Sequence, residues 1–80
     1  MNQQQDTKIS QLERALSVLA EMSPNITQDD KAFAAKELGM KYRSLAMYWT
    51  EGVGKNLDTA ISLIRVFKKR IEDREKLIGQ

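Results

Sequence analysis

Apolar side chains recur every three or four residues in two long stretches, a spacing that places them on one face of an α-helix. The first stretch consists of Ile9, Leu12, Leu16, Leu19 and Met22. It ends at residues 23–25, because Pro24 cannot continue the helical hydrogen bonds and disfavours helical geometry in the residue before it. The pattern predicts an amphipathic helix preceded by a flexible, glutamine-rich arm over residues 1–7.

A second, shorter helix is expected to follow Thr27, whose hydroxyl is a good N-cap. Asp29 and Asp30 then stand in its first turn, where the helix dipole favours negative charge. Its expected core face consists of Phe33, Ala34 or Ala35, and Leu38. Gly39 is expected to end the helix, because glycine adopts a positive φ without a Cβ clash.

Two further helices are expected after this glycine. The third spans about residues 41–50 and stops at Gly52. The fourth is the longest, spans about residues 57–78 and is capped by Asn56 or Asp58. Since no segment alternates apolar and polar residues as a strand does, the sequence predicts an all-α fold of four helices in a single domain over residues 8–80.

The apolar positions of the fourth helix keep heptad spacing, at 57, 60, 64, 67, 71 and 78, and only Arg74 interrupts the series. At 1.5 Å per residue this helix would extend about 33 Å, well past its partners. We therefore expect its distal half to pair with a second copy of the chain. The side chains expected at that interface are Ile64, Phe67, Ile71 and Ile78. In the alternative, the same face closes the core of a monomer.

Composition narrows the function classes. The chain has 80 residues, no cysteine and no histidine, so it lacks the commonest general base and the commonest metal ligands. We expect neither an enzyme nor a bound cofactor or metal, and no small-molecule substrate is evident. There is no signal peptide and no apolar run near the ~20 residues of a membrane span, so the expected setting is cytoplasmic, away from the membrane.

The charges are unevenly distributed, although the net charge is only +2. Residues 1–30 carry five acidic and two basic side chains, whereas residues 31–55 carry five basic and two acidic ones. Residues 59–80 carry six basic and three acidic side chains. The basic run at 65–70 suits a second nucleic-acid surface or, as we expect, a helix surface with ion pairs Lys68–Glu72 and Lys69–Asp73 at i,i+4 spacing.

The segment around Gly39 meets the requirements of a helix-turn-helix. Ala35 supplies the small residue of the first helix, and Gly39 supplies the turn four positions later. Leu45 and Tyr48 follow six and nine residues after the glycine, where the second helix has to bury one face. In the alternative, this is a tight turn between two core helices.

The stretch Ala34-Ala35-Lys36-Glu37-Leu38-Gly39-Met40, followed by Arg43-Ser44-Leu45, resembles the helix-turn-helix of bacterial and phage regulators, especially the Fis-type module, over about residues 28–52. Two features depart from that group. Lys41 stands where serine or threonine usually caps the second helix. About 28 residues follow the motif, which in Fis-type modules is C-terminal.

The resemblance implies sequence-selective binding of double-stranded DNA by a small transcriptional regulator acting as a dimer. Arg43 would contact a guanine edge and Met47 a thymine methyl. Phosphates or base edges would be contacted by Lys41, Tyr42 and Ser44. Phosphates alone would be contacted by Lys31, Lys36 and Lys55. Tyr48 and Trp49 are expected in the core.

Two other functions fit the same pattern. A phage DNA-packaging or segregation protein would couple such a motif to an oligomerising helix. A helical protein-interaction module, for example a phage-encoded inhibitor, would use the motif only as architecture. The oligomeric state distinguishes the first of these, and alanine replacement of Lys41 and Arg43 distinguishes the second.

Overall fold

The computed structural model describes the backbone of residues 3–50 and 54–78, and the side chains in these ranges from Ile9 onward. This part of the chain is all-α, with no strand. Its helices are α1 (Gln3–Met22), α2 (Gln28–Glu37), α3 (Tyr42–Ala46) and α4 (Leu57–Ile78). Short 3₁₀ turns follow α1 and α3, at Ser23–Asn25 and Met47–Trp49. The predicted fold class of four helices is confirmed.

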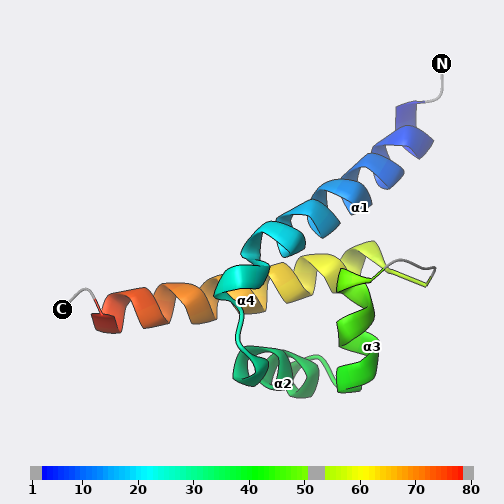
Figure 1. Cartoon of the computed structure of the whole chain (residues 1–80). Coiled ribbons are helices and arrows are strands. Elements are labelled where there is room, and N and C mark those ends of the chain that lie inside the picture. The colour runs from blue at the N-terminus through cyan, green and yellow to red at the C-terminus, as the bar shows by residue number, and fades with distance from the viewer. Residues whose placement is uncertain (1–2, 51–53, 79–80) are drawn as a thin grey trace.

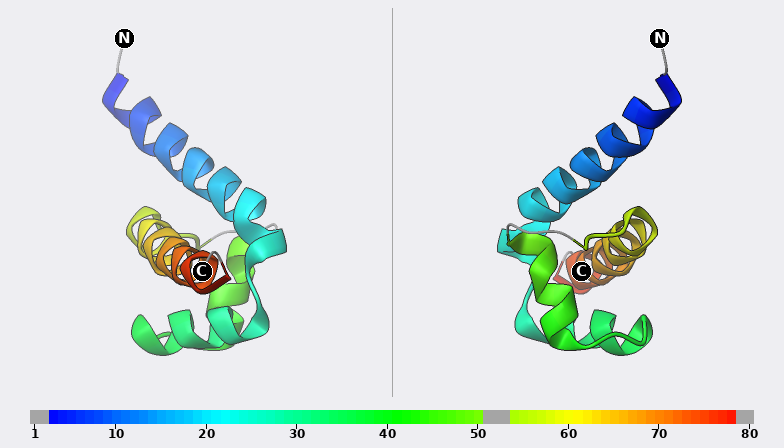
Figure 2. Two further views of the ribbon diagram at one scale, coloured as in Figure 1. Left: turned by 90° about the vertical axis from the view of Figure 1, so that its left-hand side faces the viewer. Right: turned by 90° about the vertical axis from the view of Figure 1, so that its right-hand side faces the viewer.

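Helix α4 lies in the middle of the molecule, with α1 along one side and the α2–α3 corner along another (Figures 1 and 2). The N-terminal half of α1 diverges from α4, and the distal half of α4 projects past the other helices at the opposite end (Figure 1). The molecule is therefore elongated, 51 Å in its longest dimension. Its radius of gyration is 13.9 Å, compared with about 11.6 Å for a compact domain of this length.

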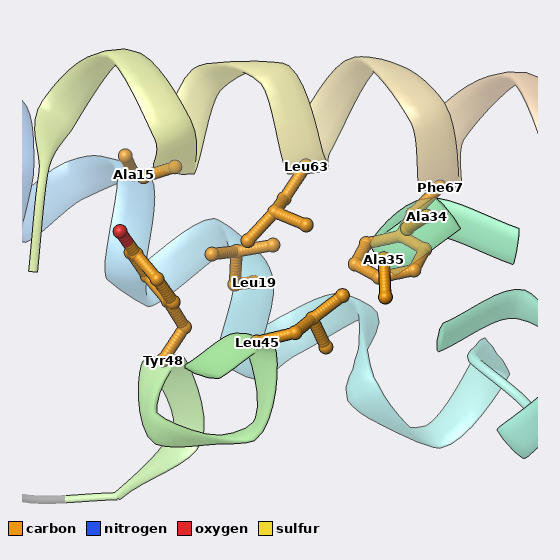
Figure 3. Packing of buried hydrophobic residues seen from close by; sticks show 9 residues of the cluster. Ala15, Leu19, Ala34, Ala35, Leu45, Tyr48, Leu63 and Phe67 are labelled. Carbon is orange, nitrogen blue, oxygen red and sulfur yellow. The ribbon is translucent and has the colours of Figure 1, made fainter. Parts of the chain in front are cut away.

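The core forms where α1, α4 and the α2–α3 corner meet (Figure 3). Leu19, Leu45, Leu63 and Phe67 are fully buried there. Small side chains at four further core positions let the helix backbones approach closely: Ala15, Ala34, Ala35 and Ala60. Apolar residues from all four described helices thus share one core.

Helix α1 begins earlier than the sequence pattern indicates. The arm expected over residues 1–7 is wrong from Gln3 onward, where the chain is already helical. Glutamine is a good helix former, and nothing before Pro24 breaks the hydrogen-bond series. The predicted apolar face packs on the core at Leu12, Leu16, Leu19 and Met22. Ile9 is 60% exposed, because α1 has diverged from α4 at that level.

Helix α4 is capped by Asn56, one of the two residues expected there. The Asn56 Oδ1 accepts a hydrogen bond from the Thr59 backbone N at 3.2 Å. The Asn56 backbone N donates to the hydroxyl of Tyr48 at 3.0 Å. This second bond ties the start of α4 to the turn after α3, and it satisfies the polar end of a side chain whose ring is buried.

Trp49 joins three elements. Its ring centroid lies 5.8 Å from that of Phe67, and its Nε1 donates to the backbone carbonyl of Leu19 at 3.0 Å. The Lys31 ammonium lies 4.8 Å from the ring centroid, in cation–π contact. The sequence predicted Trp49 in the core. It is half-buried and packs at the edge of that core.

The heptad face of α4 serves the chain's own core along its first half. Ala60 and Phe67 are fully buried, and Ile64 packs against the same cluster. Phe67 therefore belongs to the intramolecular core, not to a surface that contacts a second chain, so its predicted place at the interface is wrong. Ile71 lies beyond the core and Ile78 is 83% exposed. Within the described residues, no helix combines the length and the apolar character needed to cross a bilayer.

Candidate nucleic-acid interface

The chain reverses direction between α2 and α3 through a tight turn at Gly39. Gly39 has φ +65°, the left-handed conformation that favours glycine. The Met40 N donates to the Ala35 carbonyl at 2.9 Å, and the Gly39 N donates to the Lys36 carbonyl at 3.2 Å. These two bonds make a Schellman motif, which satisfies the last carbonyls of α2. The predicted role of Gly39 is confirmed, and the turn leads within three residues into α3.

The other end of α2 is closed by a capping box. The Thr27 Oγ1 accepts from the Asp30 backbone N at 3.1 Å, and the Asp30 Oδ2 accepts from the Thr27 N at 2.9 Å. Thr27 is thus the N-cap that the sequence predicted. The reciprocal pair satisfies two amide groups that a helix start leaves without partners. Helix α2 is fastened at both ends by hydrogen bonds that its own sequence specifies.

Asp30 also holds α2 to α4. Its Oδ1 accepts from the Arg70 Nε at 2.6 Å and from the Arg74 Nη1 at 2.7 Å, while its Oδ2 lies 2.9 Å from the Arg74 Nη1. The Asp30 side chain is fully buried, whereas the two arginine side chains keep about a third of their surface exposed. A buried carboxylate with this many donors replaces the hydration that burial removes.

The two arginines have further contacts that extend this link. The Arg74 Nη2 donates to the Asn25 carbonyl at 2.6 Å, in the 3₁₀ turn between α1 and α2. The Arg70 guanidinium lies 4.4 Å from the centroid of the Phe33 ring. Phe33 was expected on the core face of α2, and this expectation is wrong, because the ring is 43% exposed and Arg70 packs over it.

Burial alone would raise the pKa of Asp30, but hydrogen bonds from Arg74, the Thr27 amide and Arg70 hold that pKa well below its usual range. A carboxyl with a lowered pKa contributes stability above its unfolded-state pKa, about 3.9, and loses it as pH falls further.

We expect the difference in unfolding free energy between wild type and Asp30→Asn to stay constant from pH 7 to 5. Below about pH 4 this difference is expected to shrink. There the Asp30 carboxylate becomes protonated in the unfolded state but stays charged in the folded state, which lowers the unfolding free energy of wild type. Urea unfolding at a series of pH values measures this; a difference that grew with acidity would contradict it.

Helix α3 presents one buried and one exposed face. Leu45 is fully buried and Tyr48 nearly so, as the spacing from Gly39 predicted. The side chains of Lys41, Tyr42 and Arg43 are exposed. Lys41 is the N-cap residue, in extended geometry, and its side chain forms no cap hydrogen bond, so α3 begins at Tyr42. The last turn before Thr50 is 3₁₀, and the end expected at Gly52 lies outside the described residues.

The remaining residues expected at the interface differ in accessibility. Lys36 is exposed in the last turn of α2, next to the start of α3 in the chain. Ser44 and Met47 are half-buried. The Met47 Cε lies 3.2 Å from the position that a Cβ on Gly54 would occupy, so the end of the Met47 side chain faces the segment before α4.

Two of the expected phosphate contacts are less accessible. Lys55 is half-buried in the segment before α4, and the Lys31 ammonium lies over the Trp49 ring. The corner thus gathers Lys36, Lys41, Tyr42 and Arg43.

The positive charges at this corner form no salt bridge with the carboxylates that the structure describes. Among the side chains that the structure describes, both ion pairs involve Asp30, and they use Arg70 and Arg74. The pairs expected at Lys68–Glu72 and Lys69–Asp73 are not formed at salt-bridge distance in this part of the chain. Lys36, Lys41 and Arg43 therefore form no salt bridge with the carboxylates described, and the exposed acidic side chain next to them in the chain is Glu37.

The Asp30 cluster was not predicted, although one signal pointed to it. Arg74 interrupts an otherwise apolar series on the face of α4 that meets the rest of the chain. A cation on such a face requires a buried acceptor, and Asp30 supplies it from a position 44 residues earlier. The sequence alone does not identify which acidic residue that is.

The described corner is therefore a short helix, anchored by Leu45 and Tyr48, with exposed basic side chains at its start that form no salt bridge among the described residues. Comparison with known protein families, with curated proteins and with solved structures finds no match to this chain, so its function has to be argued from its own geometry.

Proposed function

We propose that this protein binds double-stranded DNA through the α2–α3 corner, with α3 in the major groove, as a small bacterial or phage transcriptional regulator. The observation that carries the proposal is the exposed, unpaired basic surface at the start of a helix that a glycine turn sets across α2. Helix-turn-helix proteins place the N-terminal residues of their second helix against base edges.

Each residue of the corner has a distinct role in this proposal. Arg43 contacts a base edge, because its planar guanidinium forms two parallel hydrogen bonds with guanine. Lys36 and Lys41 contact phosphates, which position the domain without selecting sequence. Tyr42 lies between Lys41 and Arg43 in the chain and offers a hydroxyl and an exposed ring. Met47 is half-buried and contributes at most its accessible edge, so its expected contact with a thymine methyl is the weakest of the set.

We expect Arg43→Ala to lower affinity for a selected duplex by roughly fivefold to 150-fold, the equivalent of about 1–3 kcal/mol for a bidentate base contact. The duplex comes from selection among random sequences with the purified protein. Fluorescence anisotropy measures affinity at several salt concentrations, where wild-type binding weakens steeply as counterions are released. Lys41→Ala is expected to weaken selected and random duplexes alike and to reduce the salt dependence.

Arg65→Ala is the matched control, because it removes the same kind of exposed cation from α4. It is expected to change affinity much less than Arg43→Ala. Equal losses from both variants would indicate non-specific attraction to positive charge. No measurable binding by wild type in low salt would refute the proposal and favour a protein-interaction module.

A further inference from the structure

An open groove of about 400 Å³ lies between the C-terminal half of α1 and the middle of α4. Its lining is mostly apolar, with Val18 and Met22 from α1 and Ile64 and Ile71 from α4. Val18 is 38% exposed although it lies beside the core. Burying such a surface on association is favourable.

Helix α4 carries a matching stripe that runs from its middle to its distal end. Ile64, Ile71 and Ile78 repeat every seven residues and so lie on one face of the helix. Lys68 and Glu75 lie along one flank of that stripe, on either side of Ile71. The end of this helix projects from the molecule (Figure 1), and Ile78 is 83% exposed there. One copy therefore has both an open apolar groove and a free apolar helix end.

We propose that two copies pair through antiparallel α4 helices around a two-fold axis at Ile71, each placing its distal end in the groove of the other. With Ile71 opposite itself, Ile78 of one copy lies opposite Ile64 of the second copy, beside Val18 and Met22. An isologous contact of this kind uses the same patch on both copies.

Charge selects the antiparallel direction. In an antiparallel pair the flank that carries Lys68 faces the flank that carries Glu75 of the second copy, so two opposite-charge pairs form. In a parallel pair the Lys68 flank would face the flank that carries Arg74. Arg74 is already engaged with Asp30, and its positive charge would oppose that approach. The pairing does not depend on DNA binding and is tested in its absence.

Single cysteines test the arrangement, because the chain has none of its own. Under mild oxidation Ile71→Cys is expected to give a disulfide-linked dimer on non-reducing gels. Ile78→Cys is expected to give little, because two copies of residue 78 stand about 21 Å apart in the antiparallel pair at 1.5 Å per residue. Arg65→Cys, on the solvent side of α4, is the control for random collision.

Efficient crosslinking at both 71 and 78 would overturn the antiparallel pairing in favour of a parallel one. Crosslinking at 71 no greater than at 65 would overturn the pairing altogether, as would a monomeric mass for the full chain by sedimentation at 100 μM. Circular dichroism establishes that each variant is folded.

A charge exchange gives a second, independent measurement. Lys68→Glu is expected to weaken dimerisation roughly two- to thirtyfold, since each of two symmetric surface pairs is worth about 0.2–1 kcal/mol. Adding Glu75→Lys to the same chain is expected to restore the wild-type dissociation constant, because both pairs re-form with their charges reversed. If the double variant is weaker than the single one, the two residues do not face each other and the proposed register is wrong.

Discussion

Replacing Phe67 with alanine is expected to remove about 3–5 kcal/mol of unfolding free energy, the usual cost of emptying a buried aromatic site. Phe67 is fully buried where α4 meets α1 and the α2–α3 corner, and its ring packs against Trp49. A domain of 80 residues has about 4–12 kcal/mol of stability in total, so this single substitution is expected to remove a large fraction of it. Urea unfolding followed by circular dichroism measures the loss.

The chain contains a matched control, because its only other phenylalanine is 43% exposed. Phe33→Ala removes the same ring but leaves no internal cavity. It is expected to cost about 1 kcal/mol, mostly the contact with the Arg70 guanidinium. Similar losses from the two variants would mean that the packing around Phe67 is not the principal source of stability.

Asp30→Ala is expected to destabilise the protein by about 2–4 kcal/mol, somewhat less than the removal of one partner from a fully buried ion pair. The substitution removes the acceptor of Arg70 and Arg74 and half of the capping box with Thr27. The guanidinium groups are partly exposed and regain water, which limits the loss. The midpoint of urea unfolding, compared at constant slope, gives the value.

Its neighbour Asp29 provides the comparison. Asp29 is exposed in the same first turn, so Asp29→Ala is expected to cost less than about 1 kcal/mol through the helix dipole alone. Asp30→Asn keeps the size of the side chain and one carbonyl acceptor, and its cost is expected to lie between the two alanine variants. Equal effects at positions 29 and 30 would show that the link between α2 and α4 contributes nothing.

The features predicted correctly depend on residues close together in the chain. Thr27 as the N-cap, Gly39 as the turn and Asn56 as the cap of α4 follow from the hydrogen-bonding and φ preferences of single side chains. Burial of Leu45 and Tyr48 follows from helical spacing after a fixed turn. Such local rules also explain why the bounds of α2 and α4 were predicted within a residue or two, whereas the start of α1 and the end of α3 were not.

The features missed depend on how the helices pack. Ile9 and Phe33 lie on apolar positions, yet they are exposed because α1 diverges from α4 and because Arg70 covers the ring from outside. The heptad series of α4 did not show how far α1 covers it, so Phe67 was placed on an intermolecular surface. The role of Arg74 required a partner 44 residues away, which periodicity does not reveal.

Because hydrogen bonds hold both ends of α2 in place, this helix forms a rigid connection between α4 and α3. Its ten residues span about 15 Å, with the arginine link near one end and the Gly39 turn at the other. A tilt of about 5° at the Asp30 end would move the start of α3 by about 1.3 Å over that length. We therefore expect a shift of Arg70 and Arg74 on α4 to change the position of the basic corner, about three helical turns away.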